Sequence, residues 1–262
     1  MTLILDGKDL ARAFLHLQGL TDPPGRRIGQ AGVAGLIDRL GFVQVDSINT
    51  ATRAHHQILF SRNQTYREDQ LIRLLERDRA LFENWTHDAS VIPVSSWPYW
   101  RHRFARERER LKARWTNWHG GDFHAEIDKV HAHIRENGPS RARDFDSDRE
   151  RKEPGWWNWH PGKTALEYLW RCGEIAVTAR ENFAKIYDLS ERVVPDTHFH
   201  DEVSHEDFVD WSCRSALDRL GAATHGEIAA FYDLVRPDEA KAWCERESGR
   251  SILAVEIDHG PG

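Results

Sequence analysis

The chain has 262 residues, of which 40% are hydrophobic and 30% charged, and its formal net charge is −6. This length and composition predict one large domain or a few small ones, and they exclude a disordered chain. No apolar run approaches the roughly 20 residues that a membrane-spanning helix needs, and the N-terminus lacks the pattern of a signal peptide. Three widely spaced cysteines without a CxxC pair indicate reduced thiols in the cytoplasm.

Residues 1–118 are expected to form a first winged-helix region. The stretches "GKDLARAFLHLQGL" and "IGQAGVAGLIDRLGF" predict two helices, and "VQVDSIN" follows where a strand belongs. In that strand Gln44 and Asp46 are two residues apart, so they share one face, while the two valines share the other. The pattern by itself favours a half-buried strand with its polar residues in solvent.

The alternative for this face is a pair of groups that hold one water molecule. Asp46 could orient or deprotonate the water and stabilise positive charge on a sugar. Gln44 could supply a second hydrogen bond to the same water. Hydrolysis of the glycosidic bond of a nucleotide is a reaction that needs these two groups.

Polar and aromatic side chains follow the strand in "TRAHHQILFSR" and "FENWTHDASVIP". Either they contact a ligand, or they form a polar helix with capping roles and a structural histidine. The candidates for contact with DNA are Arg53, His55, His56, Arg62, Trp85 and His87.

A basic helix is predicted in "YWRHRFARERERLKARW", which contains seven basic side chains and only two acidic ones. Such a helix could bind a polyanion although the whole chain is acidic, because binding depends on local charge. Arg101 and Arg103 are the candidates for contact with phosphates. The alternative is a solvated helix with Arg–Glu pairs at helical spacing.

Residues 119–197 show the order of a winged helix, which is three helices followed by a β-hairpin. The helices are predicted in "AEIDKVHAHIRENG", in "PSRARDF" and in "GKTALEYLWRCGE", and the hairpin surrounds "ARENF". The third helix of such a unit usually enters a DNA groove, so Lys163 at its start could meet a phosphate. Trp157, just before it, could stack on an unpaired base or pack against the helix.

Residues 198–262 are expected to form a third winged helix, in which "ILAVEI" begins a wing that stays incomplete. The stretch "THFHDEVSHED" could bind a metal, but it lacks HExxH and lies outside a helical scaffold, so we predict no metal and no cofactor. The predicted fold class is mainly α with small β-hairpins (α+β), built from tandem winged-helix (helix-turn-helix) domains. Winged helices also bind proteins, so this fold alone does not establish DNA binding.

Three stretches, "LGFVQVDSINTATRAHHQILFSR", "LFENWTHDASVIP" and "GWWNWHPGKTALEYLWRCGEI", together resemble the YcaQ/AlkZ-like winged-helix DNA glycosylases. These bacterial enzymes unhook DNA interstrand crosslinks, and their strand motif is Gln–apolar–Asp or Gln–apolar–Gln. The resemblance covers nearly the whole chain. It implies that Gln44 and Asp46 are catalytic and that the chain is similar to the YcaQ-like branch, which is associated with alkylated bases and crosslinks in general.

The resemblance implies a monofunctional DNA glycosylase that hydrolyses the N-glycosidic bond of N7-alkylguanine and unhooks crosslinks in double-stranded DNA. It implies no cofactor, a cytoplasmic location at the nucleoid and, with a surface of mixed charge, a monomer. Members of the family usually continue into a β-rich C-terminal part, and this chain departs from that pattern. The alternatives are a non-catalytic tandem winged-helix DNA-binding protein, such as a transcriptional regulator, and a metal-dependent hydrolase that rests on the histidine-rich stretch alone.

Overall fold

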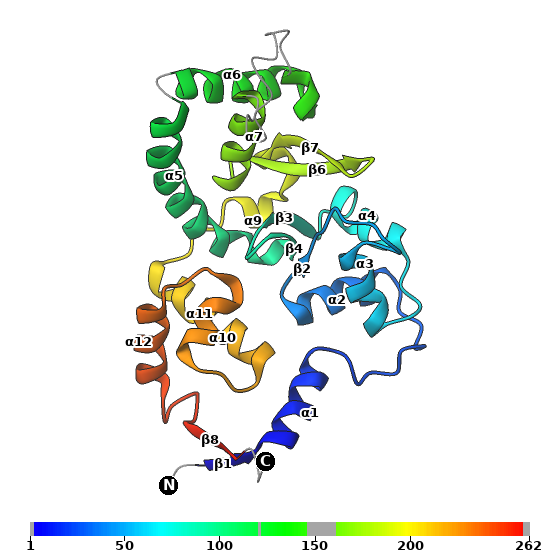
Figure 1. Cartoon of the computed structure of the whole chain (residues 1–262), viewed down its shortest axis with the longest axis vertical. Helices are drawn as coiled ribbons and strands as arrows, with labels where there is room; N and C mark the ends of the chain where they lie inside the picture. Colours follow the sequence, from blue (N-terminus) through cyan, green and yellow to red (C-terminus); the bar gives the residue numbers. More distant parts are fainter. Residues whose placement is uncertain (1–2, 120–121, 146–160, 259–262) are drawn as a thin grey trace. The chain divides into compact units, whose positions relative to one another are not determined.

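The computed structural model describes residues 3–119, 122–145 and 161–258. Helices with small β-sheets make up these residues, so the predicted α+β class is confirmed (Figure 1). The chain divides into two compact units. Unit 1 comprises Met1–Leu71, Trp85–Pro93 and Glu202–Gly262, and unit 2 comprises Ile72–Asn84 and Val94–Asp201. The finer division into three winged helices stays a prediction. No helix of the described ranges is long and apolar enough to cross a membrane.

Unit 1 is built mainly from helices that begin and end at local sequence signals. Asp6 caps α1 by accepting hydrogen bonds from the backbone N–H groups of Lys8 and Asp9, and Thr224 with Glu227 forms a capping box at α11. The helices with residues in this unit are α1 (Gly7–Leu17), α2 (Gln30–Leu40), α3 (Ala54–Arg62), α4 (Glu68–Glu76), α10 (His205–Leu220), α11 (His225–Tyr232) and α12 (Pro237–Glu247).

The core of unit 1 forms where the apolar face of α2 meets the strand that follows it. Val33 and Ile37 of α2 and Val43 of β2 (Val43–Gln44) are at most 1% exposed. Phe42 lies against the rings of Phe231 and Tyr232, with ring centroids 5.6 and 5.8 Å apart. The sequence-predicted helix and strand are therefore joined to α11 by aromatic packing.

The strand expected in "ILAVEI" is β8 (Val255–Asp258), but its partner is not a wing strand. It pairs in parallel with β1 (Leu3–Asp6), from Leu3 opposite Val255 to Asp6 opposite Asp258 (Figure 1). The sequence pattern did not indicate this pair, because it joins residues from opposite ends of the chain.

Unit 2 contains the first and third of the predicted helices and the predicted hairpin, but not the second helix. Its helices α6 and α7 both end before a glycine with positive φ, as the sequence indicated. The element predicted in "PSRARDF" is a two-residue strand followed by a single 3₁₀ turn. The elements from α5 onward are α5 (Trp97–His119), α6 (Asp122–Asn137), β5 (Ser140–Arg141), α7 (Pro161–Arg171), β6 (Ile175–Glu181), β7 (Ala184–Leu189), α8 (Ser190–Val193) and α9 (Asp196–Phe199).

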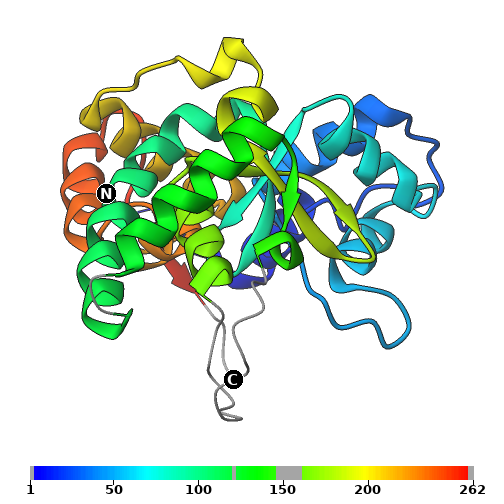
Figure 2. The ribbon, with the colours of Figure 1, turned by 90° about the horizontal axis from the view of Figure 1, so that it is seen from above.

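The predicted hairpin of unit 2 is the β6–β7 pair, which with β5 forms an antiparallel sheet of order β5–β7–β6. Its tip extends away from α6 and α7 (Figures 1 and 2). Asn182 and Phe183 form the two-residue turn, and their φ angles of 48° and 70° are those of a primed turn. A further sheet has the order β2–β4–β3, in which β3 is Leu81–Trp85 and β4 is Ala89–Pro93.

A buried carboxylate holds the hairpin to the rest of unit 2. Glu83 is 1% exposed and accepts two hydrogen bonds from the guanidinium of Arg180, at 2.6 and 2.9 Å. The ammonium of Lys185 lies 3.8 Å from the same carboxylate and 3.1 Å above the ring of Trp170. Burial lowers the pKa of Lys185, and the charge of Glu83 opposes that shift. One carboxylate therefore neutralises two cations on the hairpin.

Replacing this carboxylate tests its role. We expect Glu83→Gln to lower the free energy of unfolding by about 2–4 kcal/mol, because the change removes the buried carboxylate that pairs with two half-buried cations. Urea denaturation measures the loss. Glu109→Gln, on the exposed face of α5, is the matched control and should change stability by less than about 0.5 kcal/mol. Equal stabilities of the two variants would contradict this role.

Two helix-ending glycines of unit 2 provide a second test of packing. Gly138 and Gly173 have φ angles of +79° and +74°, but only at Gly173 would an added Cβ collide, with the ring of Phe104. We expect Gly138→Ala to cost about 1 kcal/mol from backbone strain alone. Gly173→Ala should cost a further 1–3 kcal/mol or so because the core is overpacked. Thermal and urea unfolding of both variants measure the difference, and a smaller cost at Gly173 would contradict the packing.

Candidate active site

The predicted polar pair lies in unit 1, with Gln44 on the two-residue strand β2 and Asp46 just after it. Strand β2 runs antiparallel to β4, with Gln44 opposite Ser90, and the N–H of Val45 donates to the carbonyl of Ala89 at 2.7 Å. Val43 is 1% and Val45 8% exposed, whereas Gln44 is exposed and Asp46 is half-buried. The alternation of burial therefore places the amide and the carboxylate on the outward face, as the sequence predicted.

The carboxylate of Asp46 is anchored through one oxygen. Its Oδ1 accepts a hydrogen bond of 2.8 Å from the backbone N–H of Ile48, which is the geometry of an Asx turn. Within residues 3–119, 122–145 and 161–258, Oδ2 has no hydrogen-bond donor from the protein. The side chain is thus held in one orientation with an acceptor oxygen available to a water molecule.

The amide of Gln44 contacts a residue that the sequence reasoning missed. Its Nε2 donates to Oδ2 of Asp88 at 3.4 Å, and Oδ1 of Asp88 accepts from the N–H of Ala89 at 2.8 Å. Asp88 lies in "FENWTHDASVIP", the stretch in which the sequence indicates Trp85 and His87 as candidates. Only the pairing of β2 with β4 brings this carboxylate to Gln44, and the local pattern does not reveal that pairing.

The turn that carries Asp88 is fixed by two buried hydroxyls. Thr86 and Ser90 are 2% and 0% exposed, and their Oγ atoms lie 2.9 Å apart. The carbonyl of Asp88 accepts hydrogen bonds from the N–H of Thr86 at 3.0 Å and from the hydroxyl of Ser90 at 3.2 Å. His87 is exposed at the tip and Trp85 is half-buried at its base.

The two histidines of α3 are both buried, at 5% exposure for His55 and 9% for His56. Nδ1 of His56 is 2.8 Å from the hydroxyl of Tyr66, and its Nε2 is 3.4 Å from the carboxylate of Glu68. Burial lowers the pKa of His56 and raises that of Tyr66, while Glu68 opposes the shift of the histidine. This is the geometry of a structural histidine, and the contact of His55 and His56 with DNA stays a prediction.

The two arginines at the ends of α3 differ in their surroundings. Arg62 donates to the carbonyls of Gln18 and Ile58, at 2.7 and 2.9 Å, so its guanidinium links α3 to the end of α1. Arg53 is the half-buried N-cap residue of α3. Contact of either with DNA also stays a prediction.

Much of the positive charge on the basic helix α5 is engaged within unit 2. Arg103 is only 3% exposed, Arg108 pairs with Glu174, and Arg110 pairs with Glu107 at 2.7 Å. The residues with exposed cations include Arg101, which donates to the carbonyls of Phe199 and Asp201, and Lys163 in the first turn of α7. Trp157 lies outside the described residues.

The histidine-rich stretch does not gather metal ligands. Among the residues that the structure describes, no group of three or more His, Cys, Asp or Glu side chains could hold a metal ion. Nε2 of His205 lies 2.9 Å from a carboxylate oxygen of Glu239. The geometry gives no support to the metal-dependent hydrolase.

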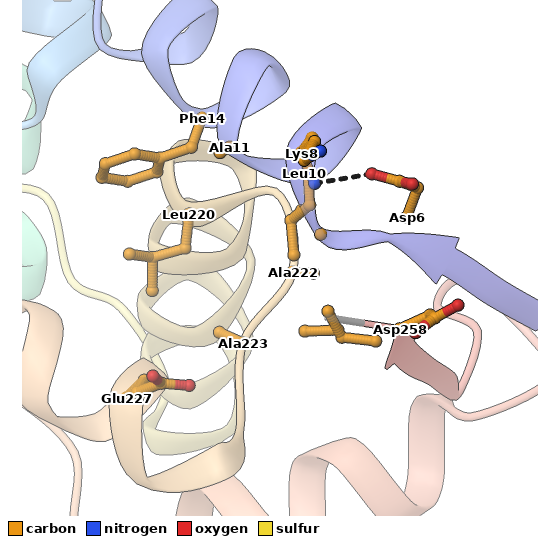
Figure 3. A pocket seen from close by; sticks show the side chains of 12 residues that line it. Asp6, Lys8, Leu10, Ala11, Phe14, Leu220, Ala222, Ala223, Glu227 and Asp258 are labelled. Atoms are coloured by element: carbon orange, nitrogen blue, oxygen red, sulfur yellow. Dashed lines mark hydrogen bonds between the residues drawn. The ribbon is translucent and has the colours of Figure 1, made fainter. Parts of the chain in front are cut away.

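A groove of about 900 Å³ lies elsewhere in unit 1, between α1, the α10–α11 turn and β8 (Figure 3). Phe14 and Leu220 lie on its apolar side, and the charged groups around it include Asp6, Glu227 and Asp258 (Figure 3). None of the sequence-predicted site residues lines this groove. The candidate active site therefore remains the polar pair of Gln44 and Asp46.

Comparison with known proteins identifies the family and the fold of the chain. A model of the family "DNA glycosylase AlkZ-like" matches residues 37–262, which include β2, α3 and the turn with Asp88. The solved structure of Streptomyces sahachiroi DNA glycosylase AlkZ matches with a TM-score of 0.66 and 13% identity, over 94% of this chain and 66% of that one. The chain therefore spans about two thirds of the length of that protein, and the likeness confirms the fold. With most of its length matched by the family model, this chain belongs to the AlkZ-like DNA glycosylase family.

Proposed function

We propose that this chain is a monofunctional DNA glycosylase that releases N7-alkylguanine from double-stranded DNA. The observation that carries the proposal is the pair of an exposed amide at Gln44, on β2, and a half-buried carboxylate at Asp46, two residues further along, with one anchored oxygen. Membership of the family supports the reaction class. Two such groups suffice to position one water molecule.

The reaction needs few other groups from the protein, because the damaged base is already a good leaving group. Guanine alkylated at N7 carries a positive charge, so it leaves as a neutral base when it takes the electrons of the C–N bond. The sugar becomes an oxocarbenium-like cation, which the carboxylate of Asp46 stabilises. Water forms the new bond to the sugar carbon and gives its proton to Asp46. The motif holds no lysine to attack the sugar, so the product is an abasic site.

We extend the proposal to interstrand crosslinks. A base tethered to the opposite strand cannot rotate freely into a closed pocket. Gln44 is exposed, and the polar face of β2 belongs to a strand at a sheet edge, which suits a base reached from a groove of the duplex. Acting on DNA, the protein would work as a monomer at the nucleoid.

Contacts with the phosphate backbone are proposed for Arg101 and Lys163, which are both exposed in unit 2. Arg103 is left out because a guanidinium that is 3% exposed does not reach a phosphate without unfolding its surroundings. Phosphate contacts would position the duplex without reading its sequence.

Base release tests the proposed reaction. We expect the protein to release 7-methylguanine from a methylated duplex and leave alkali-labile sites, with a rate that a chelator does not change. Asp46→Asn should lower the single-turnover rate by about 10²–10³-fold, because the charge that stabilises the transition state is lost. Gln44→Ala should lower it by about 10-fold or more, since one hydrogen bond to the water is removed.

Three outcomes would contradict parts of this proposal. DNA binding without any base release would favour the non-catalytic DNA-binding protein. Undiminished release by both Asp46→Asn and Gln44→Ala would refute the catalytic assignment of the pair. Loss of release with the chelator would revive a metal-dependent reaction.

The salt dependence of DNA binding tests the phosphate contacts. We expect Arg101→Ala to weaken binding alike on all sequences and to reduce the slope of log K against log salt by about 1. Arg12→Ala, an equally charged change on the exposed face of α1, is the control and should leave the slope unchanged. An unchanged slope for Arg101→Ala would instead indicate that this face of α5 is exposed to solvent and does not contact phosphates.

A further inference from the structure

We propose that Asp88 is a positioning residue that sets the orientation of the Gln44 amide toward the attacking water. This inference rests on the proposed glycosylase function and adds a residue to it. Asp88 is in contact with Gln44, and its carboxylate takes no part in the bond changes of the proposed reaction.

The chemistry of the contact fixes which end of the amide faces Asp88. An ionised carboxylate only accepts hydrogen bonds, whereas an amide donates through nitrogen and accepts through oxygen. Nε2 of Gln44 is therefore the atom that faces Oδ2 of Asp88, at 3.4 Å. Turning the amide over would place its oxygen against the carboxylate, and the two would repel. Oε1 of Gln44 is consequently the atom left for other partners.

The position of Asp88 is itself constrained by the backbone around it. Its Oδ1 accepts the N–H of Ala89 at 2.8 Å, and its carbonyl accepts the N–H of Thr86 at 3.0 Å. Ala89 in turn accepts the N–H of Val45 at 2.7 Å, which joins the turn to the strand with Gln44. The carboxylate is thus held opposite the amide by the strand pairing and does not depend on its own rotamer alone.

This orientation has a consequence for the water. Oε1 of Gln44 and Oδ2 of Asp46 are both acceptors, so one water can donate a proton to each of them. Its oxygen then keeps both lone pairs free, and one of them attacks the sugar carbon. An overturned amide would instead donate to that oxygen, which occupies one of its two lone pairs and makes the water a weaker nucleophile. The role of Asp88 is to exclude this unproductive arrangement.

Asp88→Asn tests the inference, because asparagine keeps an oxygen for the N–H of Ala89 but loses the charge that orders Gln44. The measurement is single-turnover release of 7-methylguanine from a methylated duplex, together with the affinity for that duplex. We expect the rate to fall about 10-fold, as for the loss of one hydrogen bond to a charged group, with no loss of affinity. Asp88→Glu should recover most of the rate.

The matched control is Asp218→Asn, which removes the same charge from the exposed face of α10. It should release base at the unchanged rate. Thermal unfolding of each variant shows whether the fold is kept, and Asp88 is exposed, so little change in stability is expected.

A double-variant cycle separates positioning through Gln44 from an independent role. In a Gln44→Ala background, Asp88→Asn should have no further effect, because there is no amide left to orient. A further 10-fold loss in that background, or an unchanged rate for Asp88→Asn alone, would overturn the inference while the proposed function stands. If the unaltered protein released no base, the proposed function and this inference would both fall.

Discussion

The candidate site depends on the pairing of the two-residue strand β2 with β4. Val43 and Val45 are buried by this pairing, and burying each side chain contributes about 1.5–3 kcal/mol. A slip of one residue would expose both valines and bury Gln44 and Asp46 instead. The outward direction of the two polar groups is therefore enforced by the burial of their neighbours. The register of β2 against β4 thus both buries the two valines in the core and leaves the amide and the carboxylate accessible.

The same register joins the strand to the turn between β3 and β4. The buried hydroxyl of Ser90 donates to the carbonyl of Asp88 and lies 2.9 Å from that of Thr86, which helps to fix the shape of that turn. A turn fixed in this way can hold the carboxylate of Asp88 against Gln44 although both residues are exposed. Rigid support beneath exposed polar groups is what a hydrolytic site requires, because catalysis depends on groups that are already in place.

The sequence predicted those features whose causes are local. The helices α2, α6 and α7, the β6–β7 hairpin and the alternation around Gln44 follow from side-chain periodicity and from glycines at helix ends. The sequence did not predict the β1–β8 pair or the contact of Asp88 with Gln44, because both depend on strands that meet only in the folded chain. The catalytic interpretation of Gln44 and Asp46 came from the family resemblance, since the pattern alone favoured ordinary surface.

The charge of the basic helix α5 is a further property that the sequence alone does not predict, because it depends on contacts formed only in the folded chain. Counted along the sequence, α5 has a strong positive charge, but Arg103 is buried, and Arg108 and Arg110 are paired with carboxylates of their own unit. A cation that already neutralises a carboxylate adds little attraction for phosphate. Arg103, Arg108 and Arg110 should therefore contribute little to the salt dependence of DNA binding. In the proposed glycosylase, discrimination of damaged from normal DNA would then depend on the polar face of β2 and on the charge of the damaged base.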